Sequence, residues 1–324
     1  MKVLYIGGYS RSGSTMLLRV LGEATGTVAI GELIYIFERG FVQDQLCGCG
    51  ERFRRCPFWN EVSQAAFGVA SDKAPGAELM ALQHRVLGYG AFPALWVPAL
   101  RSPAHRRELA EYGEIVGRMY RAIAEISGAH IVIDSSKVPQ FARLLTEVPG
   151  LELHVAHLVR DSRGSAYSWQ RKKVRTEVHW TTAHMDRHSL LRSSVEWDAF
   201  NVLFGVDRKR PRTYTLIRYE DLVGDPGPIL ADLAERIGEP SIAAELRTTR
   251  EEVSLEISHT VAGNPSRFSS GRTKIVADQE WQRSMPAVQR LLVTAVTAPL
   301  LRHYRYPLQV TRETADPLAL PGTR

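Results

Sequence analysis

The residues with the clearest capacity for chemistry stand in one short stretch near the start of the chain. Residues 8–15 read GYSRSGST and follow the apolar run VLYI, so they join a predicted buried strand to the start of a helix. The stretch fits the phosphate-binding pattern G-x-x-x-x-G-K-[ST], except that Ser14 replaces the lysine. In a nucleoside triphosphatase that lysine reaches the β- and γ-phosphates. The loop therefore lacks the charge clamp for γ-phosphate transfer, and Arg11, in mid-loop, is its only cation.

What remains of the pattern still suits an anion. Glycines let the backbone approach a phosphate, and free amides at the start of a helix point toward it. Ser14 and Thr15 add hydroxyl donors, and Arg11 adds a fixed positive charge. The loop favours a single phosphate that carries a transferable group, bound without a metal bridge.

A second segment of this kind is LVRDSRGSAYS at residues 158–168, where a strand ends and a helix begins. Arg160 can contact two oxygens of a phosphate with its planar guanidinium. Ser168 lies two helical turns later and can supply a hydroxyl. Each residue also has an ordinary interpretation, since Arg160 could pair with Asp161 or another acid and Ser168 could be a simple helix serine. The presence of both loops in one chain favours the phosphate site.

Four further segments place reactive or aromatic side chains at predicted strand ends and loops. They are IGEL with Glu32, DSSKVP with Lys137, RYEDL with Tyr219, and GNPSRF with Arg267, the last followed by D-x-x-W at 278–281.

Together these segments resemble sulfotransferases that use 3′-phosphoadenosine 5′-phosphosulfate (PAPS), in particular bacterial members and the carbohydrate and tyrosyl-protein branches. The resemblance covers residues 3–34, 131–170, 212–226 and 259–281. It implies that PAPS is the cosubstrate and that no metal takes part. The implied donor-binding residues are Arg11, Ser12, Gly13, Ser14 and Thr15 for the 5′-phosphosulfate, Arg160 and Ser168 for the 3′-phosphate, Tyr219 for the adenine, and Arg267 for a phosphate.

The same resemblance implies the catalytic residues. Glu32 lies where the tyrosyl-protein branch has a catalytic glutamate, so it is the expected base for the acceptor hydroxyl. Cytosolic relatives use a histidine, and therefore three histidines stay open as alternatives: His179, His184 and His188. Lys137 matches a lysine that neutralises the bridging oxygen as the sulfuryl group departs. Arg11 is expected to act beside it during in-line attack.

The scaffold expected for these residues is an α/β fold. Short apolar runs at 3–6, 131–134, 153–159 and 214–217 read as buried parallel strands, and helices are predicted to begin near Ser14, Pro139, Ser162 and Pro226. The alternation predicts a P-loop-like three-layer sandwich with a central, mainly parallel sheet flanked by helices. Ligands of such sheets bind at the carboxyl ends of the strands.

The domain prediction is a single sulfotransferase domain over 1–306 with two excursions. A lid or acceptor insertion is expected at about 41–128, between the first and second of those strands, and it includes an amphipathic helix at about 107–126. A second acceptor-side segment is expected at about 172–192, and a C-terminal tail at 307–324.

Composition limits the partners. A formal charge of +6 on 324 residues suits an anionic ligand, but it is too dispersed to indicate nucleic acid. The sequence shows neither a signal peptide nor an apolar run of the roughly 18 residues that a membrane span needs. We therefore expect a cytoplasmic protein with no membrane span. Its expected acceptor is a hydroxyl of a small molecule, natural product or carbohydrate.

The three cysteines, Cys47, Cys49 and Cys56, lie within ten residues. No histidine stands near them in the sequence to complete a zinc set, so free thiols are favoured over a metal site or a disulfide. Two other functions remain open: a P-loop-type kinase with a degenerate loop, and a non-catalytic nucleotide-binding protein. The missing lysine and the Arg160–Ser168 pair speak against the kinase.

Overall fold

The computed structural model describes residues 1–250 and 252–309, and within them a five-stranded parallel sheet forms the centre. The strands are β1 (Lys2–Gly7), β2 (Thr27–Gly31), β3 (Ile131–Lys137), β4 (Glu152–Val159) and β5 (Thr213–Arg218). They lie in the order β2-β3-β1-β4-β5. The predicted α/β fold is therefore confirmed, and all four predicted strands are present.

The strand of the central sheet that was not predicted is β2, with the sequence TVAIG. It is short, it forms one edge of the sheet, and its first two residues are only partly buried. Residues 41–128 lie between the first two predicted strands, which are β1 and β3. Because β2 precedes them, they directly connect β2 to β3.

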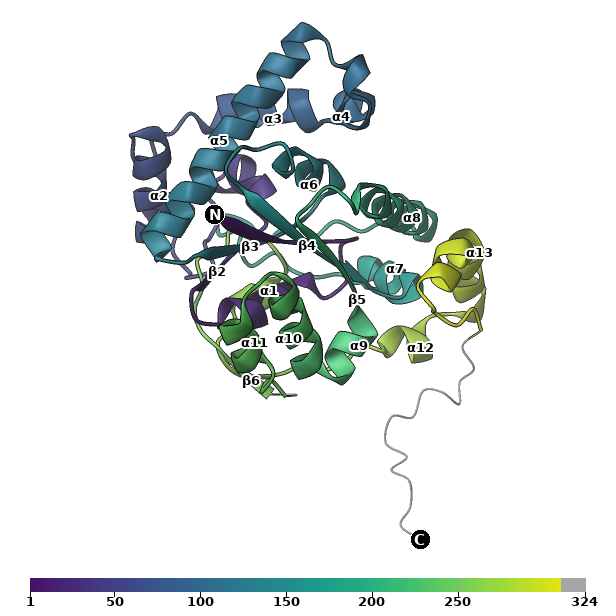
Figure 1. The fold of residues 1–324 in the computed structure, drawn as a ribbon. Helices are drawn as coiled ribbons and strands as arrows, with labels where there is room; N and C mark the ends of the chain where they lie inside the picture. Colours follow the sequence, from purple (N-terminus) through teal and green to yellow (C-terminus); the bar gives the residue numbers. More distant parts are fainter. Residues whose placement is uncertain (251, 310–324) are drawn as a thin grey trace.

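Helices cover both faces of the sheet (Figure 1). The strand alternation divides the core, since Leu4 and Ile6 of β1 face one apolar cluster while Val3 and Tyr5 face the other. The first cluster is closed by α1 (Ser14–Gly22), α10 (Pro226–Arg236) and α11 (Pro240–Leu246). The second is closed by α5 (Pro103–Ser127), α6 (Pro139–Leu145) and α8 (Leu190–Asp207). This is the expected three-layer arrangement.

The predicted helix starts are confirmed at α1, α6, α7 (Ser162–Gln170) and α10, and the predicted amphipathic helix is α5. The other elements between β2 and α5 are η1 (Leu33–Tyr35), η2 (Ile36–Val42), η3 (Phe53–Arg55), α2 (Pro57–Phe67), α3 (Gly76–Leu87), η4 (Tyr89–Ala91), α4 (Phe92–Trp96) and η5 (Pro98–Leu100). The C-terminal part holds α9 (Tyr219–Gly224), the antiparallel pair β6 (Glu252–Leu255) and β7 (Gly271–Lys274), η6 (Pro265–Phe268), α12 (Glu280–Ser284) and α13 (Ala287–His303). Of the predicted tail, 310–324 lie outside the described residues.

The topology places a crevice at the end of β1. This strand lies between β3 and β4, with Gly7 in register with Lys137 on one side and His157 on the other. The chain leaves β1 toward β2, whereas it leaves β4 toward β5 on the opposite side. Such a reversal of direction opens a ligand crevice beyond the carboxyl ends of the strands.

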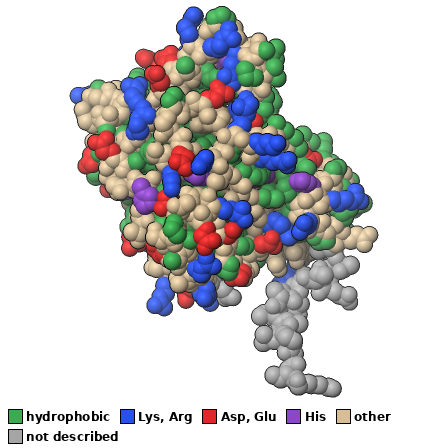
Figure 2. Space-filling model, viewed as in Figure 1, with side chains coloured by type: hydrophobic (Ala, Val, Ile, Leu, Met, Phe, Trp, Pro, Cys, Tyr) green, Lys and Arg blue, Asp and Glu red, His purple; other side chains and the backbone are tan. Residues whose placement is uncertain are grey.

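The surface gives no sign of a large single-sign patch on the face seen in Figure 2, where Lys and Arg side chains are interspersed with Asp and Glu. Among the described residues, no helix has the length and apolar character needed to cross a membrane.

Candidate active site

The first loop, residues 8–13, joins β1 to α1 and has an unusual backbone. Gly8 and Gly13 have φ angles of 121° and 91°, and Arg11 has a φ of 69° although it is not a glycine. At Gly13 no side chain fits, because an added Cβ would lie 2.6 Å from Cδ2 of Tyr219. The loop thus packs directly on the Tyr219 ring, and its amides at the start of α1 stay free of side-chain cover.

The Arg11 side chain lies against an aromatic face rather than a carboxylate. Its Cζ is 4.8 Å from the centroid of the Trp169 ring, and Nη2 donates to Sδ of Met185 at 3.3 Å. Burial lowers the pKa of Arg11, and the negative charge of Glu32 partly restores it. An arginine stays charged under these conditions, so the loop carries a desolvated cation that is ready for an anion.

Glu32 and Lys137 form a buried ion pair at the carboxyl ends of β2 and β3. Their side chains are 11% and 7% exposed, and Lys137 Nζ also donates to the carbonyl of Ser135 at 2.8 Å. Lys137 has a φ of 65°, so both proposed catalytic cations have left-handed backbone. Such strain costs of order 1–3 kcal/mol and tends to cluster at functional sites.

A polar network beneath this pair fixes the segment after Glu32. Asp134, fully buried in β3, accepts hydrogen bonds from Tyr120 Oη and from both N–H and Oγ–H of Ser136. Ser136 Oγ in turn accepts from the Ile34 amide at 3.1 Å. Burial raises the pKa of Asp134 to about 6, although its hydrogen bonds oppose the shift. The network ties β3 to the turn that carries Glu32.

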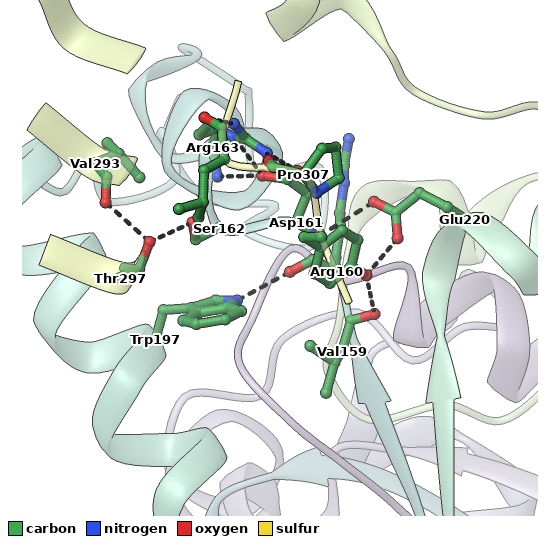
Figure 3. A network of polar contacts seen from close by, with 12 residues as sticks. Val159, Arg160, Asp161, Ser162, Arg163, Trp197, Glu220, Val293, Thr297 and Pro307 are labelled. Atoms are coloured by element: carbon green, nitrogen blue, oxygen red, sulfur yellow. Dashed lines mark hydrogen bonds and ion pairs between the residues drawn. The ribbon is translucent and has the colours of Figure 1, made fainter. Parts of the chain in front are cut away.

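The second loop is held by a separate network at the end of β4 (Figure 3). Arg163 binds both carboxylate oxygens of Asp161, with Nε–Oδ1 at 2.9 Å and Nη2–Oδ2 at 2.6 Å. The Asp161 amide donates to Oε1 of Glu220 at 3.2 Å, and Trp197 Nε1 donates to the carbonyl of Arg160 at 3.0 Å. The backbone of Arg160 is therefore fixed, and Asp161 is occupied by Arg163 rather than by Arg160.

The Arg160 side chain connects the two loops. Nη1 donates to the carbonyl of Arg11 at 3.1 Å, and Nη2 donates to the carbonyl of Asp278 and lies 3.4 Å from its Oδ2. Its Cζ is 4.7 Å from the centroid of Tyr219, whose Oη accepts from the Asp278 amide at 3.0 Å. Nε is buried and has no hydrogen-bond partner. Of the ordinary alternatives, a pairing with an acid is present, and the acid is Asp278.

These segments converge on one cleft of about 480 Å³ at the carboxyl ends of the strands. The predicted site residues that line it are Arg11, Gly13, Ser14, Thr15, Glu32, Lys137, Arg160, Ser168 and Tyr219. Its other charged residues are Arg39, Lys173 and Asp278, so five cations face two carboxylates. Such a balance in a recessed site focuses a positive potential on the ligand.

Two predicted donor-binding residues lie outside the cleft lining. Ser12 is 1% exposed, and its Oγ is buried without a hydrogen-bond partner. Arg267 is 2% exposed, and its guanidinium donates to the carbonyls of Thr260 and, at 2.7 Å, Leu46. Arg267 thus lies beneath the loop that borders the cleft, bound to backbone on both sides.

None of the three alternative histidines lines the cleft. His179 Nε2 is 3.1 Å from the carbonyl of Asp44, and His184 is exposed. His188 stacks on the outer side of the site against Trp169, with ring centroids 3.8 Å apart. In this geometry Glu32 is the nearer candidate for a base.

The cleft is also lined by charged side chains that the sequence motifs did not include, above all Arg39 and Lys173. Arg39 Cζ lies 4.1 Å from the ring centroid of Tyr35, another lining residue. Burial, and next the charge of Arg11, lower the pKa of Lys173. A signal existed for Lys173, because it falls in the segment 172–192 that was expected to face the site, but Arg39 stands in no recognisable pattern.

The three cysteines do not line the cleft, and none of them forms a disulfide. The expectation that no histidine completes the set was wrong. The fold brings His259 to it from more than 200 positions away in the sequence, with Nδ1 3.2 Å from Sγ of Cys56.

No protein-family model and no curated protein matches this sequence. Among solved structures, the chain is similar to the sulfotransferase domain from the Synechococcus PCC 7002 olefin synthase, with a TM-score of 0.50, 17% identity, and 95% of this chain and 96% of that chain covered. Lower scores relate it to the sulfotransferase domain from the curacin biosynthetic pathway (TM-score 0.47, 15% identity, 95% and 98% covered). Sulfotransferase STF9 from Mycobacterium avium is also similar, with a TM-score of 0.46, 13% identity, and 95% of this chain and 78% of that chain covered. The first of these similarities shows that the chain has the fold of that sulfotransferase domain.

Proposed function

We propose that this protein is a sulfotransferase that moves the sulfuryl group of PAPS to a hydroxyl of a small molecule, natural product or carbohydrate. The observation that carries the proposal is the meeting of two anion-binding loops at one cleft. Arg160 and Arg11 are 149 positions apart, yet Arg160 Nη1 bonds to the carbonyl of Arg11 at 3.1 Å. A donor with phosphates at its 5′ and 3′ positions requires two such neighbouring sites.

Donor binding is divided between the loops in this proposal. The amides at the start of α1, together with Ser14, Thr15 and Arg11, take the 5′-phosphosulfate. Arg160 and Ser168 take the 3′-phosphate. Tyr219 supports the adenosine from below, between the first loop and Arg160.

The position of Arg267 changes its role in the proposal. Its guanidinium is bound to two backbone carbonyls and is 2% exposed. We therefore assign it to the support of the loop that follows His259, which lines the cleft with Gly263 and Asn264. It takes no part in phosphate contact.

The chemistry assigns one task to each residue of the buried pair. The acceptor hydroxyl gives its proton to Glu32 as its oxygen forms a bond to sulfur, and the bond from sulfur to the bridging oxygen breaks. Lys137 and Arg11 stabilise the charge on that oxygen as adenosine 3′,5′-bisphosphate (PAP) leaves. Lys137 must exchange Glu32 for the bridging oxygen, and this exchange frees the carboxylate to accept the proton.

The acceptor side of the cleft combines apolar and cationic groups. Trp169, Met185 and Tyr35 line it together with Arg39 and Lys173. We infer an acceptor with a ring or apolar body and a hydroxyl that reaches Glu32. Its negative or polar substituents would face the two cations.

The first test is ligand-dependent thermal stability. PAP without metal is expected to raise the melting temperature, whereas ATP with magnesium is not. Stabilisation by ATP–magnesium and not by PAP would support the kinase alternative. Radiolabelled PAPS is then offered with a panel of phenols, sugars and aliphatic alcohols. PAP binding without transfer to any acceptor, and with no effect of Arg11→Ala on it, would favour a non-catalytic nucleotide-binding protein.

A further inference from the structure

The second feature of the structure with the chemistry of a site is a cluster of three thiols and one imidazole. Cys47, Cys49, Cys56 and His259 place their sulfur and nitrogen atoms within 4.8 Å of one another. Cys47 and Cys56 are buried, and the other two residues are half-buried. None of the four residues lines the cleft, and no catalytic step proposed above uses them.

The spacing of these atoms fits a tetrahedral metal ion. With Zn–S near 2.3 Å and Zn–N near 2.0 Å, a tetrahedron has S–S edges of about 3.8 Å and S–N edges of about 3.5 Å. The Cys49–Cys56 sulfur distance is 3.7 Å, and His259 Nδ1 lies 3.8 Å from Sγ of Cys47 and 3.2 Å from Sγ of Cys56. Since a disulfide needs about 2.05 Å between sulfurs, the arrangement is not that of a cystine.

The loop of the cysteines is shaped to present them. A turn closes with the Gly50 amide donating to the carbonyl of Cys47 at 2.9 Å. Between the first two cysteines, Gly48 donates to the carbonyl of Thr260 at 2.9 Å. An added Cβ at Gly48 would lie 2.4 Å from the carbonyl oxygen of Ser258, so only glycine lets this loop approach the histidine segment so closely.

The imidazole is oriented by its neighbours. Its ring stacks on Phe58 with centroids 4.9 Å apart and an interplanar angle of 12°. The carbonyl of His259 accepts from Nε1 of Trp59 at 2.9 Å. Both aromatic residues lie in the first turn of α2, which begins at Pro57 next to Cys56. The stack on Phe58 restricts the plane of the imidazole, and the bond from Trp59 holds the backbone that carries it.

The charge around the cluster also fits a metal with three thiolates. Zn²⁺ with three thiolates and a neutral imidazole carries a net charge of −1, which is costly to bury alone. Arg267 supplies a buried positive charge directly beside it. Its guanidinium bonds to the carbonyl of Leu46, which precedes Cys47, and to that of Thr260, which follows His259.

We propose that Cys47, Cys49, Cys56 and His259 bind one Zn²⁺ ion in a closed, structural site. Four protein ligands leave no open coordination position, so the ion has no role as a Lewis acid. Its role is to fasten the start of the insertion to the segment 256–264. That segment also reaches the sheet edge, because the Val261 amide donates to the carbonyl of Ile30 at 3.0 Å, two positions before Glu32.

The metal content of the wild-type protein tests the site without reference to activity. Protein purified under reducing conditions from zinc-supplemented medium is expected to contain about one zinc ion per chain by mass spectrometry. Exchange with Co²⁺ should give the intense d–d bands of a tetrahedral ion and thiolate-to-cobalt charge-transfer absorption. Because the chain has no other cysteine, a thiol reagent reports on this site alone. Zinc should protect the thiols, and a chelator should expose them.

Variants then assign the ligands. Cys56→Ser and His259→Ala are expected to lose most of the zinc and to lower the melting temperature, whereas His303→Ala, at an exposed histidine, should leave both unchanged. If the ligand variants are insoluble, the cobalt spectrum of the wild type decides alone. The proposal is overturned if zinc-grown wild type contains no zinc and shows no tetrahedral cobalt bands. A native disulfide between any two of the cysteines would overturn it as well. Neither result would bear on PAPS binding, which is measured separately.

Discussion

Arg160 offers the sharpest test of the proposed donor site, because its partners within the protein are defined. Its Nη2 lies 3.4 Å from Oδ2 of Asp278, whose side chain is 35% exposed. Nη1 and Nη2 also donate to the carbonyls of Arg11 and Asp278, and Nε has no partner. In the proposed complex, the 3′-phosphate of the donor therefore competes with a partly exposed carboxylate for a guanidinium that is already held in place.

The expected loss of PAP affinity on truncation of Arg160 follows from this competition with Asp278. Truncation of one partner in a buried, hydrogen-bonded charge pair costs about 2–5 kcal/mol. Because Asp278 already satisfies part of the guanidinium, we expect the lower end for Arg160→Ala. A loss of about 2–3 kcal/mol corresponds to a PAP dissociation constant roughly 30- to 160-fold higher. Asp278→Asn should act in the opposite direction and strengthen PAP binding by up to about 1 kcal/mol, since it removes a competitor in a partly exposed pair.

The assay is calorimetric titration of each variant with PAP, with circular dichroism to show that the variants are folded. Arg187→Ala serves as the matched control, because Arg187 is exposed, carries the same charge, and does not line the cleft. Arg160→Lys keeps the charge but loses the planar guanidinium that can contact two phosphate oxygens, so its affinity for PAP should fall between those of wild type and Arg160→Ala. If folded Arg160→Ala bound PAP within twofold of the wild type, the assignment of the 3′-phosphate site would be wrong.

The remaining predictions concern the buried groups around the cleft. Lys137→Ala should lower kcat by about 10²–10³, as expected for the loss of a group that stabilises developing charge, in a single-turnover assay with saturating PAPS. An unchanged kcat would exclude Lys137 from the transition state. Glu32→Gln should lower kcat by about 10²–10⁴ with a PAP affinity close to that of wild type, and full turnover with every acceptor would remove Glu32 as the base. Asp134 should make the unfolding free energy of the wild type depend on pH, because its pKa is about 6 in the folded protein and 3.8 for an ordinary aspartate. The stabilisation from its proton is complete below pH about 4 and is lost as the pH rises through about 6. Asp134→Asn should flatten the slope of unfolding free energy over that range in urea titrations, and an unchanged slope would mean that another carboxyl group is responsible.

Much of the fold could be predicted because its signals are local. Buried parallel strands contain short apolar runs, as β1, β3 and β4 do, and the edge strand β5, although only partly buried, carries the run at 214–217 from which it was predicted. The edge strand β2 is five residues long and half-buried at its start, so its pattern does not differ from that of a loop. What makes it a strand is its pairing with β3, which lies about 100 residues later and cannot be inferred from the local sequence.

The site residues also divide into those that a local sequence pattern marks and those that only the folded chain brings to the site. Residues in recognisable segments, such as Arg11 and Arg160, were found because glycine spacing and strand-to-helix junctions mark them. Arg39 could not be distinguished from the other members of a set of 41 Lys and Arg residues. The distance from Cys56 to His259 along the chain is 203 positions, so only the folded chain shows that they meet.

The left-handed backbone at Arg11 and Lys137 has a consequence for the balance between stability and activity. A non-glycine residue at a positive φ lowers the free energy of unfolding by about 1–2 kcal/mol relative to glycine. The two cations therefore destabilise the fold at these positions. Alanine and glycine variants separate the two effects, because both remove the charge and only glycine relieves the strain. Arg11→Gly should be more stable than Arg11→Ala by about 1 kcal/mol and equally inactive. Selection for thermal stability alone would therefore favour glycine at position 11. The arginine at this position is thus explained by a need for its charge and not by the free energy of folding.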